Sequence, residues 1–516
     1  IALQLTERIT MAKNLIFITA DQWRGECLGS LGHLVQTPNL DALAREGVLF
    51  RQHYANAVPC GPSRASIHTG MYLQNHRSGT NGTPLDSRHT NWARELRTHG
   101  RDPVLFGYTD TANDPRDFDP QDPILRSYEG PLPGIRPIVQ MGTFPDAWAD
   151  WLAAKGYEVP SPNWRFYTNK TAEPEYEDGG TAPAPLALPA EHHDTYFMVD
   201  QVIDFVENNA GDFCIHLSLL RPHPPWVAPE PYNRLYPPGD LADLVRAPSI
   251  EAERQQHPYL DWTLRRPRHF APPDDRKLLR MKASYFGLMT EVDDNLGRLF
   301  DYLKANNLWD STLIIFTSDH GEQIGDHWLL GKMGYFDQSY HIPLIIRDPD
   351  PAADAARGLQ LNSFTENIDI MPTLLDWLDI QVPVQCDGQS LLTVARRGTF
   401  PANWRTEAHW EFDFRSVPNG EPHEAELGLT QHQCTLNVIR SNQYKYVHFT
   451  NLPPLFFDLD KDPAELTNQA NNPEYLPLVL EYSQKMLSWR MNHDEQTLTH
   501  MALTDDGVVS RPASRY

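Results

Sequence analysis

Val58-Pro-Cys-Gly-Pro-Ser-Arg-Ala-Ser-Ile-His-Thr-Gly70 is the stretch around which this chain is organised, and it predicts a cysteine at the entrance of a short helix. Pro62 suits the first helical position, because the N–H that it lacks would have no partner there. Gly70 can end the helix in a left-handed conformation. The positive end of the helix dipole favours an oxyanion beside Cys60, and Arg64 adds a fixed cation. A buried cysteine that only packs ahead of a capped helix is the alternative interpretation.

The composition is that of an acidic globular protein. The chain has 516 residues, of which 40% are hydrophobic, and its formal net charge of -24 disfavours nucleic acid as a partner. The five cysteines are too widely spaced for a disulfide framework or a cysteine-rich zinc site; they are Cys27, Cys60, Cys214, Cys386 and Cys434. Since no apolar run reaches the ~20 residues that cross a bilayer, we predict no membrane association.

The N-terminus lacks the cationic and apolar regions of a secretory signal, so we expect a cytoplasmic protein. Ile1–Thr10 precede Met11 and are either an upstream extension or a remnant of cloning.

Two apolar segments far apart in the sequence end in polar side chains. Asn14–Ala20 is followed by Asp21-Gln22, and Thr312–Thr317 is followed by Ser318-Asp319-His320. Both read as buried parallel strands, whose carboxyl ends meet at one edge of a sheet. Their carboxylate, amide and imidazole groups suit a hard divalent ion such as Ca²⁺, Mg²⁺ or Mn²⁺, and the imidazole favours Mn²⁺. Taken singly, each residue could equally be a polar loop residue.

The remaining patterns predict an α/β fold in which a large, mostly parallel sheet lies between helices. We expect helices over 37–47, 91–100, Asp194–Asn209, Asp275–Asn306 and Asn367–Leu378, of which the last is interrupted at Pro372. Further strands are expected over Pro103–Phe106, Phe213–Leu219 and Ile342–Arg347. Segments 112–190 and 227–273 are rich in proline and read as irregular insertions, the first of which would cover the site.

From about residue 385 the hydrophobic pattern changes to short segments of alternating polarity, which predicts a smaller α+β subdomain. Its short alternating strands form an antiparallel sheet with a helix against it; the strands are Cys434–Ile439, Tyr444–Phe449 and Leu455–Leu459, and the helix is Tyr475–His493. We therefore predict a catalytic domain over 11–384, the subdomain over 385–493, and a terminal segment over 494–516. That segment is either a disordered tail or an arm that packs on another subunit.

With these motifs assembled, the chain resembles the sulfatase family of the alkaline phosphatase superfamily. Cys60-x-Pro-Ser-Arg64 followed by Thr69-Gly70 matches the sulfatase signature, and Asp21-Gln22 and Ser318-Asp-His-Gly-Glu322 match the metal-binding segments. The resemblance is narrower to the phosphonate monoester hydrolases and extends over nearly the whole chain, through Asn75-His-Arg77, Arg221-Pro-His-Pro-Pro225, Leu330-Gly-Lys332, Tyr444–Phe449 and Pro454–Asp458.

The resemblance implies a fold like that of alkaline phosphatase and a specific set of site residues. A maturation enzyme would oxidise Cys60 to formylglycine, whose hydrated aldehyde supplies the attacking hydroxyl. One divalent cation, Mn²⁺ or Ca²⁺, would be held by Asp21, Gln22, Asp319 and His320, with the modified Cys60 as a further ligand. Arg64, Asn81 and Lys332 would position the nucleophile and the transferred group. His223 and Lys332 are the candidates to protonate the leaving oxygen.

The predicted reaction is hydrolysis of small anionic esters. Many arylsulfatases have Lys-x-His where this chain has Tyr108-Thr109-Asp110, and that difference favours phosphonate monoesters and phosphodiesters, with some sulfate monoester activity. The phosphonate branch is expected to have threonine at Asp110, which here could serve as a base, repel substrate, or only form a turn.

Three further expectations stay open at this stage. An arylsulfatase with a native sulfate ester is the alternative within the family. A two-metal Ser/Thr phosphatase or phosphomutase-like enzyme is the alternative of another class, although Ser63 lies inside the helix and is a poor nucleophile candidate. Relatives with a similar C-terminal extension form dimers or tetramers, so we expect a homo-oligomer with 494–516 as its intersubunit arm.

Overall fold

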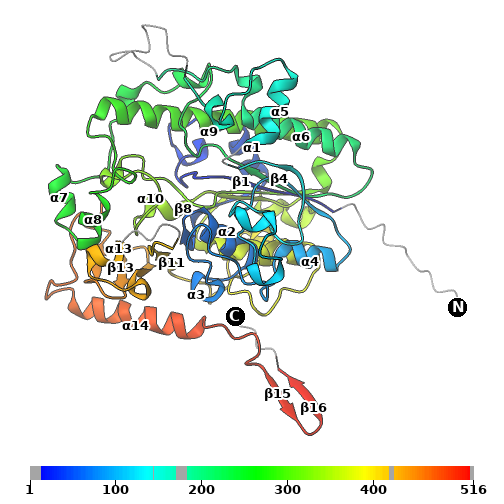
Figure 1. Cartoon of the computed structure of the whole chain (residues 1–516). Coiled ribbons are helices and arrows are strands. Elements are labelled where there is room, and N and C mark those ends of the chain that lie inside the picture. Colours follow the sequence, from blue (N-terminus) through cyan, green and yellow to red (C-terminus); the bar gives the residue numbers. More distant parts are fainter. Residues whose placement is uncertain (1–12, 143–144, 170–182, 418–422, 512–516) are drawn as a thin grey trace.

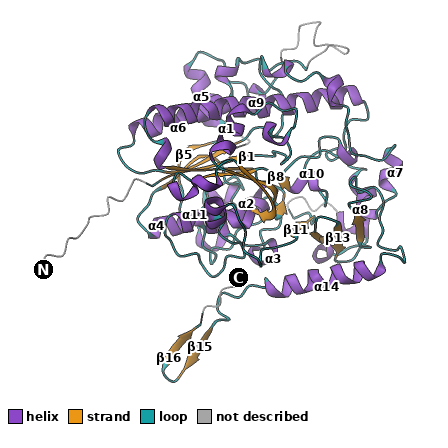
Figure 2. Cartoon of the chain, turned by 180° about the vertical axis from the view of Figure 1, so that it is seen from behind, coloured by secondary structure: helices purple, strands orange, loops and turns teal. Residues whose placement is uncertain are grey.

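The computed structural model describes residues 13–142, 145–169, 183–417 and 423–511, and there it shows a large sheet with helices on both faces (Figure 1). One face is covered by α1 (Pro38–Glu46), α5 (Asp146–Ala154), α6 (Asp194–Asn208) and α9 (Asp275–Ala305). The other is covered by α2 (Cys60–Thr69), α4 (Trp92–Thr98), α11 (Ile370–Trp377) and α12 (Leu392–Arg397). The view from behind shows the first three of these helices on that face (Figure 2).

Within the described residues the large sheet has nine strands, in the order β10-β2-β9-β7-β1-β6-β4-β5, with β8 paired to β2. They are β1 (Asn14–Ala20), β2 (Val48–Tyr54), β4 (Pro103–Gly107), β5 (Arg136–Gln140), β6 (Cys214–Leu219), β7 (Thr312–Thr317), β8 (His341–Ile342), β9 (Leu344–Arg347) and β10 (Leu359–Glu366). The pairs among β1, β4, β5, β6 and β7 are parallel, whereas β9 runs antiparallel to β7 and β2. The predicted α/β class with a mostly parallel central sheet is confirmed.

The centre of this sheet is buried on both faces. In β1, Ile16 and Ile18 pack into the core under α9, while Leu15 and Phe17 pack into the core over α2 and α11. A strand with two covered faces needs apolar side chains at every position, which is why its sequence is a continuous apolar run. The strand β7 is built in the same way and pairs in parallel register with β1, from Asn14 opposite Thr312 to Thr19 opposite Thr317.

A second sheet, of five strands in the described part of the chain, lies beside the first in the order β14-β13-β12-β11-β3. Its strands are β3 (Ala57–Val58), β11 (Ala408–Asp413), β12 (Thr435–Arg440), β13 (Tyr444–Phe449) and β14 (Leu455–Asp458), and α14 (Leu476–Asn492) packs against it. The predicted antiparallel sheet is present, but β3 joins β11 in parallel and comes from the N-terminal part of the chain. Since β3 directly precedes Cys60, this sheet helps to fix the start of α2.

The structure corrects several expected boundaries. The helix α2 begins at Cys60 itself, so Pro62 is its third residue, still in the first turn where its missing N–H costs nothing. Likewise α11 begins at Ile370, and Pro372 lies in its first turn without interrupting it. Segment 112–190 contributes α5 and the edge strand β5, so its described part is not wholly irregular.

Besides β5 and the two C-terminal strands described below, four strands and several short helices among the described residues were not predicted from the sequence. The strands are β2, β3, β10 and β11, and the helices are α3 (Leu73–His76), α7 (Ile250–Arg254), α8 (Pro258–Thr263), α10 (Asp337–Tyr340), α12 and α13 (His423–Leu427). The N-terminal extension Ile1–Thr10 lies outside the described residues. In the described part of the chain, no helix combines the length and the apolar character needed to cross a membrane.

The described C-terminal residues form a two-stranded hairpin that projects from the body of the molecule (Figure 1). Its strands are β15 (Met501–Thr504) and β16 (Gly507–Ser510), and they carry exposed apolar side chains such as Leu503, which is 85% exposed. A projecting hairpin has the form of an arm. Its contact with another subunit stays a prediction, as do the proposed domain limits.

Gly107 ends β4 at a point where a side chain would not fit. Its φ is +114°, and a Cβ built there would lie 1.9 Å from the carbonyl oxygen of Ser218 on β6. We predict that Gly107→Ala lowers the free energy of unfolding by roughly 2–6 kcal/mol, because conformational strain and overlap each cost roughly 1–3 kcal/mol.

Gly156→Ala is the matched control for Gly107→Ala, since Gly156 has a φ of +92° and nothing within 4 Å of its Cβ position. Gly156→Ala should lower the free energy of unfolding only by the cost of conformational strain, without the cost of overlap. Denaturant unfolding curves measure both losses, and equal losses would contradict the close approach of β4 to β6.

Candidate active site

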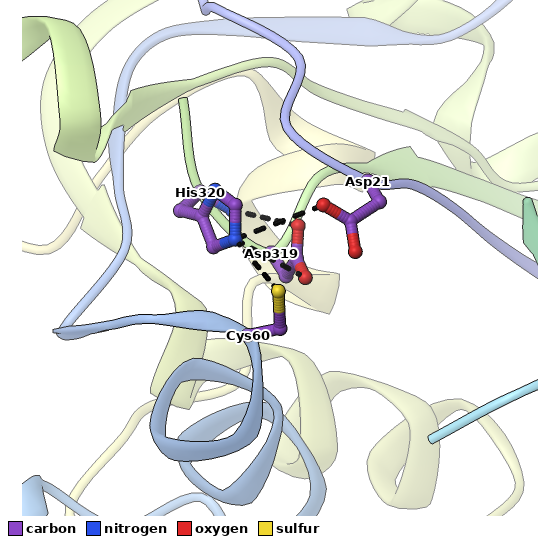
Figure 3. A group of neighbouring side chains, drawn as sticks. All are labelled: Asp21, Cys60, Asp319 and His320. Atoms are coloured by element: carbon purple, nitrogen blue, oxygen red, sulfur yellow. Dashed lines mark hydrogen bonds and ion pairs between the residues drawn. The ribbon is translucent and has the colours of Figure 1, made fainter. Parts of the chain in front are cut away.

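Cys60 lies in the first turn of α2 and is surrounded by polar side chains from both apolar strands (Figure 3). It is 5% exposed. Its Sγ lies 3.2 Å from Nε2 of His320 and accepts a hydrogen bond of 3.0 Å from Nζ of Lys332. Burial, followed by the charge of Asp21, raises the pKa of the Cys60 thiol well above its usual value. The thiol is therefore protonated and in contact with a lysine and a histidine.

Asp21, Cys60, Asp319 and His320 form a compact cluster in which one ligand atom of each lies within 4.8 Å of the others (Figure 3). Asp21 follows β1, and Asp319 and His320 follow β7, so the parallel pairing of the two strands brings them together. Oδ1 of Asp21 is buried and has no hydrogen-bond partner among the described residues. Two carboxylates, one of them with this unpartnered oxygen, and an imidazole fit one hard divalent cation. Among the described residues this is the one such cluster.

The imidazole of His320 is oriented for such a role. Its Nδ1 lies 3.0 Å from the carbonyl oxygen of Gly321, which can only accept a hydrogen bond. Nδ1 therefore carries the proton, and Nε2 presents its lone pair to the cluster, as metal-binding histidines usually do. Burial also lowers the pKa of His320, which keeps the ring neutral.

Gln22 lies beside the cluster but its side chain is engaged elsewhere. Its Oε1 accepts a hydrogen bond of 2.9 Å from Nζ of Lys332, and its Nε2 donates to Glu322. Its backbone N–H donates to Oδ1 of Asp319 at 3.1 Å. Glu322 also accepts from the backbone N–H groups of Ile324 and Gly331. This buried glutamate thus ties Gln22 to the loop that carries Lys332.

Arg64 is fully buried and bridges the two carboxylates. Its Nε donates to Oδ2 of Asp319 at 2.9 Å, and its Nη2 donates to Oδ2 of Asp21 at 3.2 Å. Its Nη1 donates to the carbonyl oxygen of Tyr108 and to Oγ of Ser218. The guanidinium thus holds the two carboxylates in place through charge-assisted hydrogen bonds.

Tyr108 and Asp110 follow β4 and form another wall of the site. The hydroxyl of Tyr108 donates to Oδ2 of Asp21, and its ring lies 4.2 Å from the Arg64 guanidinium. Asp110 has a φ of +46°, and its Oδ2 lies 3.9 Å from Nε of Arg64. Its Oδ1 is buried and finds no hydrogen-bond partner in the described part of the chain. Burial raises the pKa of Asp110 to about 8, so its carboxyl is neutral at pH 7.

Asn81 and His223 lie on loops at the margin of the site. Oδ1 of Asn81 accepts the backbone N–H of Gly61 at 2.8 Å, and so caps α2 directly beside Cys60. His223 is half-buried, its Nδ1 lies 2.7 Å from the carbonyl oxygen of Pro224, and its charge couples to those of Asp21 and Lys332. Burial lowers the pKa of His223 to about 3, so the free ring is neutral.

The structure also shows contacts of the site to which the sequence analysis assigned no residue. Glu322, the last residue of the Ser318–Glu322 segment, holds Gln22, and Ser218 holds Arg64. Tyr128 lies in segment 112–190, two residues before Gly130, which pairs with Thr111 next to Asp110. Glu322 and Ser218 follow or end apolar strands, which is the signal that found Asp21 and Asp319. Tyr128 carries no such signal, because its segment has no periodic pattern. Its position supports the prediction that this insertion covers the site.

Comparisons with known proteins agree on one family. The family model described as sulfatase matches residues 13–380, and a second one, described as N-sulphoglucosamine sulphohydrolase, C-terminal, matches residues 325–492. The chain is 43% identical over 517 residues to the multifunctional alkaline phosphatase superfamily protein PehA of Trinickia caryophylli, covering 97% of this chain and 99% of that protein. It is 27% identical to an arylsulfatase of Clostridium perfringens, over 95% and 96% of the two chains.

A solved structure extends this similarity to three dimensions. The fold matches the crystal structure of the phosphonate monoester hydrolase of Agrobacterium radiobacter with a TM-score of 0.90 and 43% identity. The match covers 97% of this chain and 99% of that one. Sequence and architecture are thus similar along the same, almost complete, length.

Asp110 provides a pH-dependent test of this geometry in protein treated with a chelator. The pKa of an aspartate carboxyl group is ordinarily 3.8 and is about 8 at Asp110 in the folded chain, so the folded state holds the proton more tightly. Wild-type stability should therefore fall relative to Asp110→Asn as the pH rises from 4 to 8, by up to about 1.4 kcal/mol per pH unit. Above pH 8 the difference should level off. Urea unfolding of both proteins between pH 4 and 9 measures the difference in their free energies of unfolding. A difference that does not change with pH would contradict the burial of the Asp110 carboxyl group.

Proposed function

The chain belongs to the sulfatase family and is an ester-bond hydrolase, and we propose that it is a formylglycine-dependent enzyme acting on phosphonate monoesters and phosphodiesters. Sulfate monoesters are its weaker substrates. The observation that carries this proposal is the position of Cys60, in the first turn of α2 and within the cluster of Asp21, Asp319 and His320. The relative at 43% identity with a TM-score of 0.90 is named as a phosphonate monoester hydrolase.

The proposal includes the oxidation of Cys60 to formylglycine by a maturation enzyme. Sγ of the cysteine then stands for an oxygen of the hydrated aldehyde, which would supply the hydroxyl nucleophile. Asp21, Asp319 and His320 would hold one divalent cation, Mn²⁺ or Ca²⁺, with Gln22 adjacent. When bound, this cation would neutralise charge on the ester oxygens and lower the pKa of the attacking hydroxyl.

The residues of the chain have separate tasks in this proposal. Lys332 lies 3.0 Å from Sγ of Cys60 and can contact both the nucleophile and the anionic group of the ester. Asn81 caps the helix turn that carries Cys60, and Arg64 keeps Asp21 and Asp319 close in spite of their like charges. Lys332 thus supplies a local positive charge for an anionic ester in a protein whose net charge is -24.

His223 is the proposed proton donor to the leaving oxygen. Its Nδ1 is bound to a carbonyl oxygen, so Nε2 is the nitrogen free to meet the substrate. The ring is neutral in the free protein, with a pKa of about 3. An anionic ester next to Nε2 raises that pKa, because a nearby negative charge favours the imidazolium form.

The wall formed by Tyr108 and Asp110 supports the proposed substrate class. Sulfate and phosphate monoesters expose three terminal oxygens, whereas phosphodiesters and phosphonate monoesters expose two and replace the third with a neutral substituent. Neither Tyr108 nor Asp110 offers a cation for a third oxygen, and the Tyr108 hydroxyl is already bound to Asp21.

The position of Ser63 does not support the alternative of a two-metal Ser/Thr phosphatase or phosphomutase-like enzyme. Its side chain is fully buried, donates to the carbonyl oxygen of Asp319 and accepts from Nδ2 of Asn367 at 3.2 Å. A serine nucleophile would need to face a bound ester. The alternative within the family, an arylsulfatase, is supported by the 27% identical relative of that name.

Rates on two aryl esters test the proposed substrate class. We expect kcat/KM for p-nitrophenyl phenylphosphonate to exceed that for p-nitrophenyl sulfate by roughly tenfold or more, equivalent to about 1.4 kcal/mol in transition-state stabilisation. Both esters release the same phenolate, so the ratio reports on the transferred group. A higher kcat/KM on the sulfate would favour the arylsulfatase alternative.

Loss of one carboxylate charge tests the proposed metal site. Asp319→Asn should weaken Mn²⁺ binding by roughly tenfold or more and lower kcat with it, because the cluster loses an anionic oxygen donor. Isothermal titration calorimetry measures the affinity at pH 7. Asp110→Asn is the control, since Asp110 lies outside the cluster and is neutral at that pH. Equal Mn²⁺ affinities in wild type and Asp319→Asn would remove Asp319 from the site.

A further inference from the structure

A second buried group of charges lies behind the loop that carries His223. Arg221 is fully buried, and its Nη1 donates hydrogen bonds to the carbonyl oxygens of His223, at 2.6 Å, and Pro225, at 3.1 Å. Its Nε donates to Oδ2 of Asp194 at 3.0 Å. The guanidinium thus joins the backbone of His223 and of Pro225 to Asp194, the first residue of α6.

Asp194 is itself held from several sides. The hydroxyl of Tyr167 donates to its Oδ2 at 2.8 Å, and the Tyr167 ring lies 4.4 Å from the Arg221 guanidinium. Nε2 of His193 lies 3.3 Å from Oδ1 of Asp194, and Nδ1 of His193 lies 3.0 Å from Glu291 on α9. Burial opposes the negative charge of Asp194, but Arg221 lowers its pKa, so it stays ionised. The loop is therefore fastened to two long helices.

The sequence of the loop explains why it needs such a fastening. Arg221-Pro-His-Pro-Pro225 contains three prolines, which have no backbone N–H and cannot anchor the segment through donors of their own. Its carbonyl groups are instead bound by side-chain donors. Arg221 binds two of them, and Nε1 of Trp226 donates to the carbonyl oxygen of Pro222 at 3.2 Å.

We propose that Arg221, held by Asp194, is a positioning residue that fixes Nε2 of His223 for proton transfer to the leaving oxygen of the ester. The inference rests on the proposed function, in which His223 is the proton donor. Arg221 itself contacts carbonyl oxygens and Asp194, so it acts on the reaction through His223. A planar fork is needed because donors to two carbonyls and a carboxylate must be held in fixed directions, which the single ammonium group of lysine cannot supply.

The test uses Arg221→Lys and a series of aryl phenylphosphonates whose leaving phenols span a range of pKa values. Arg221→Lys keeps the charge that Asp194 needs but loses the fork. We expect kcat to fall roughly 10- to 100-fold for the poorest leaving groups, the size typical of general acid catalysis, with KM and the rate for the best leaving group nearly unchanged. A uniform loss over the whole series would overturn the inference.

A double-mutant cycle with His223→Ala separates positioning from a merely structural role. If Arg221 acts through His223, Arg221→Lys should cost no further rate once His223 is alanine. Additive losses would overturn the inference while leaving the role of His223 intact. If the single variant His223→Ala loses no more rate with poor leaving groups than with good ones, both this inference and the role of His223 as proton donor are overturned.

Arg347→Lys is the matched control. Arg347 is also buried, donates to the carbonyl oxygens of Trp309 and Thr312, and lies 4.3 Å from a ring of Trp309, but at the opposite end of β7 from the site. It should change stability without changing the leaving-group dependence. Should Arg221→Lys fail to fold, Tyr167→Phe removes only the hydroxyl bound to Asp194. It should produce a smaller loss with the same dependence on the leaving group, and a loss independent of the leaving group would overturn the inference.

Discussion

One buried guanidinium, Arg64, holds together the two carboxylates on which the rest of the site depends. Asp21 and Asp319 follow paired strands in parallel register, so the sheet alone brings two negative charges together away from water. Such a pair is costly unless it is neutralised and hydrogen-bonded. Arg64 supplies both, and it does so from the first turns of the helix that also carries Cys60. Arg64 therefore links the helix that carries the cysteine to the geometry of the carboxylates.

The elements that place this site were predictable because they are buried on both faces. The continuous apolar runs of β1 and β7 gave their bounds from sequence, and the polar residues after them lie together in the structure. The edge strands β5 and β10 were missed because many of their side chains are exposed. In β5 four of five residues are exposed, and the first part of β10 is largely exposed, so neither has a clear apolar pattern.

The individual side-chain contacts of the site were the part that sequence patterns could not give. The side chain of Gln22, a predicted metal ligand, contacts Lys332 and Glu322 in the structure. Arg64, predicted to position the transferred group, donates hydrogen bonds to Asp21 and Asp319. Such contacts depend on how helices, strand ends and loops meet in three dimensions, which residue types and spacing do not determine. The functional roles assigned to the site residues remain predictions.

The second sheet contributes to the site by fixing the chain just before Cys60. The strand β3 pairs with β11, and the ring of Trp410 in β11 stacks between Tyr54, with centroids 5.5 Å apart, and Tyr340, at 4.8 Å. The core of the small sheet is thereby continuous with the edge of the large one. A rigid entry to α2 keeps Cys60 beside the strand ends, which supports both the metal-type cluster and the proposed nucleophile.

The most direct test of the central claim is mass spectrometry of the peptide that contains Cys60, combined with the activity of the same preparations. The account predicts that the Cys60 thiol is replaced by an aldehyde or its hydrate, and that kcat rises in proportion to the converted fraction when a maturation enzyme is co-expressed. Full activity in a preparation whose Cys60 is entirely an unmodified thiol would contradict it.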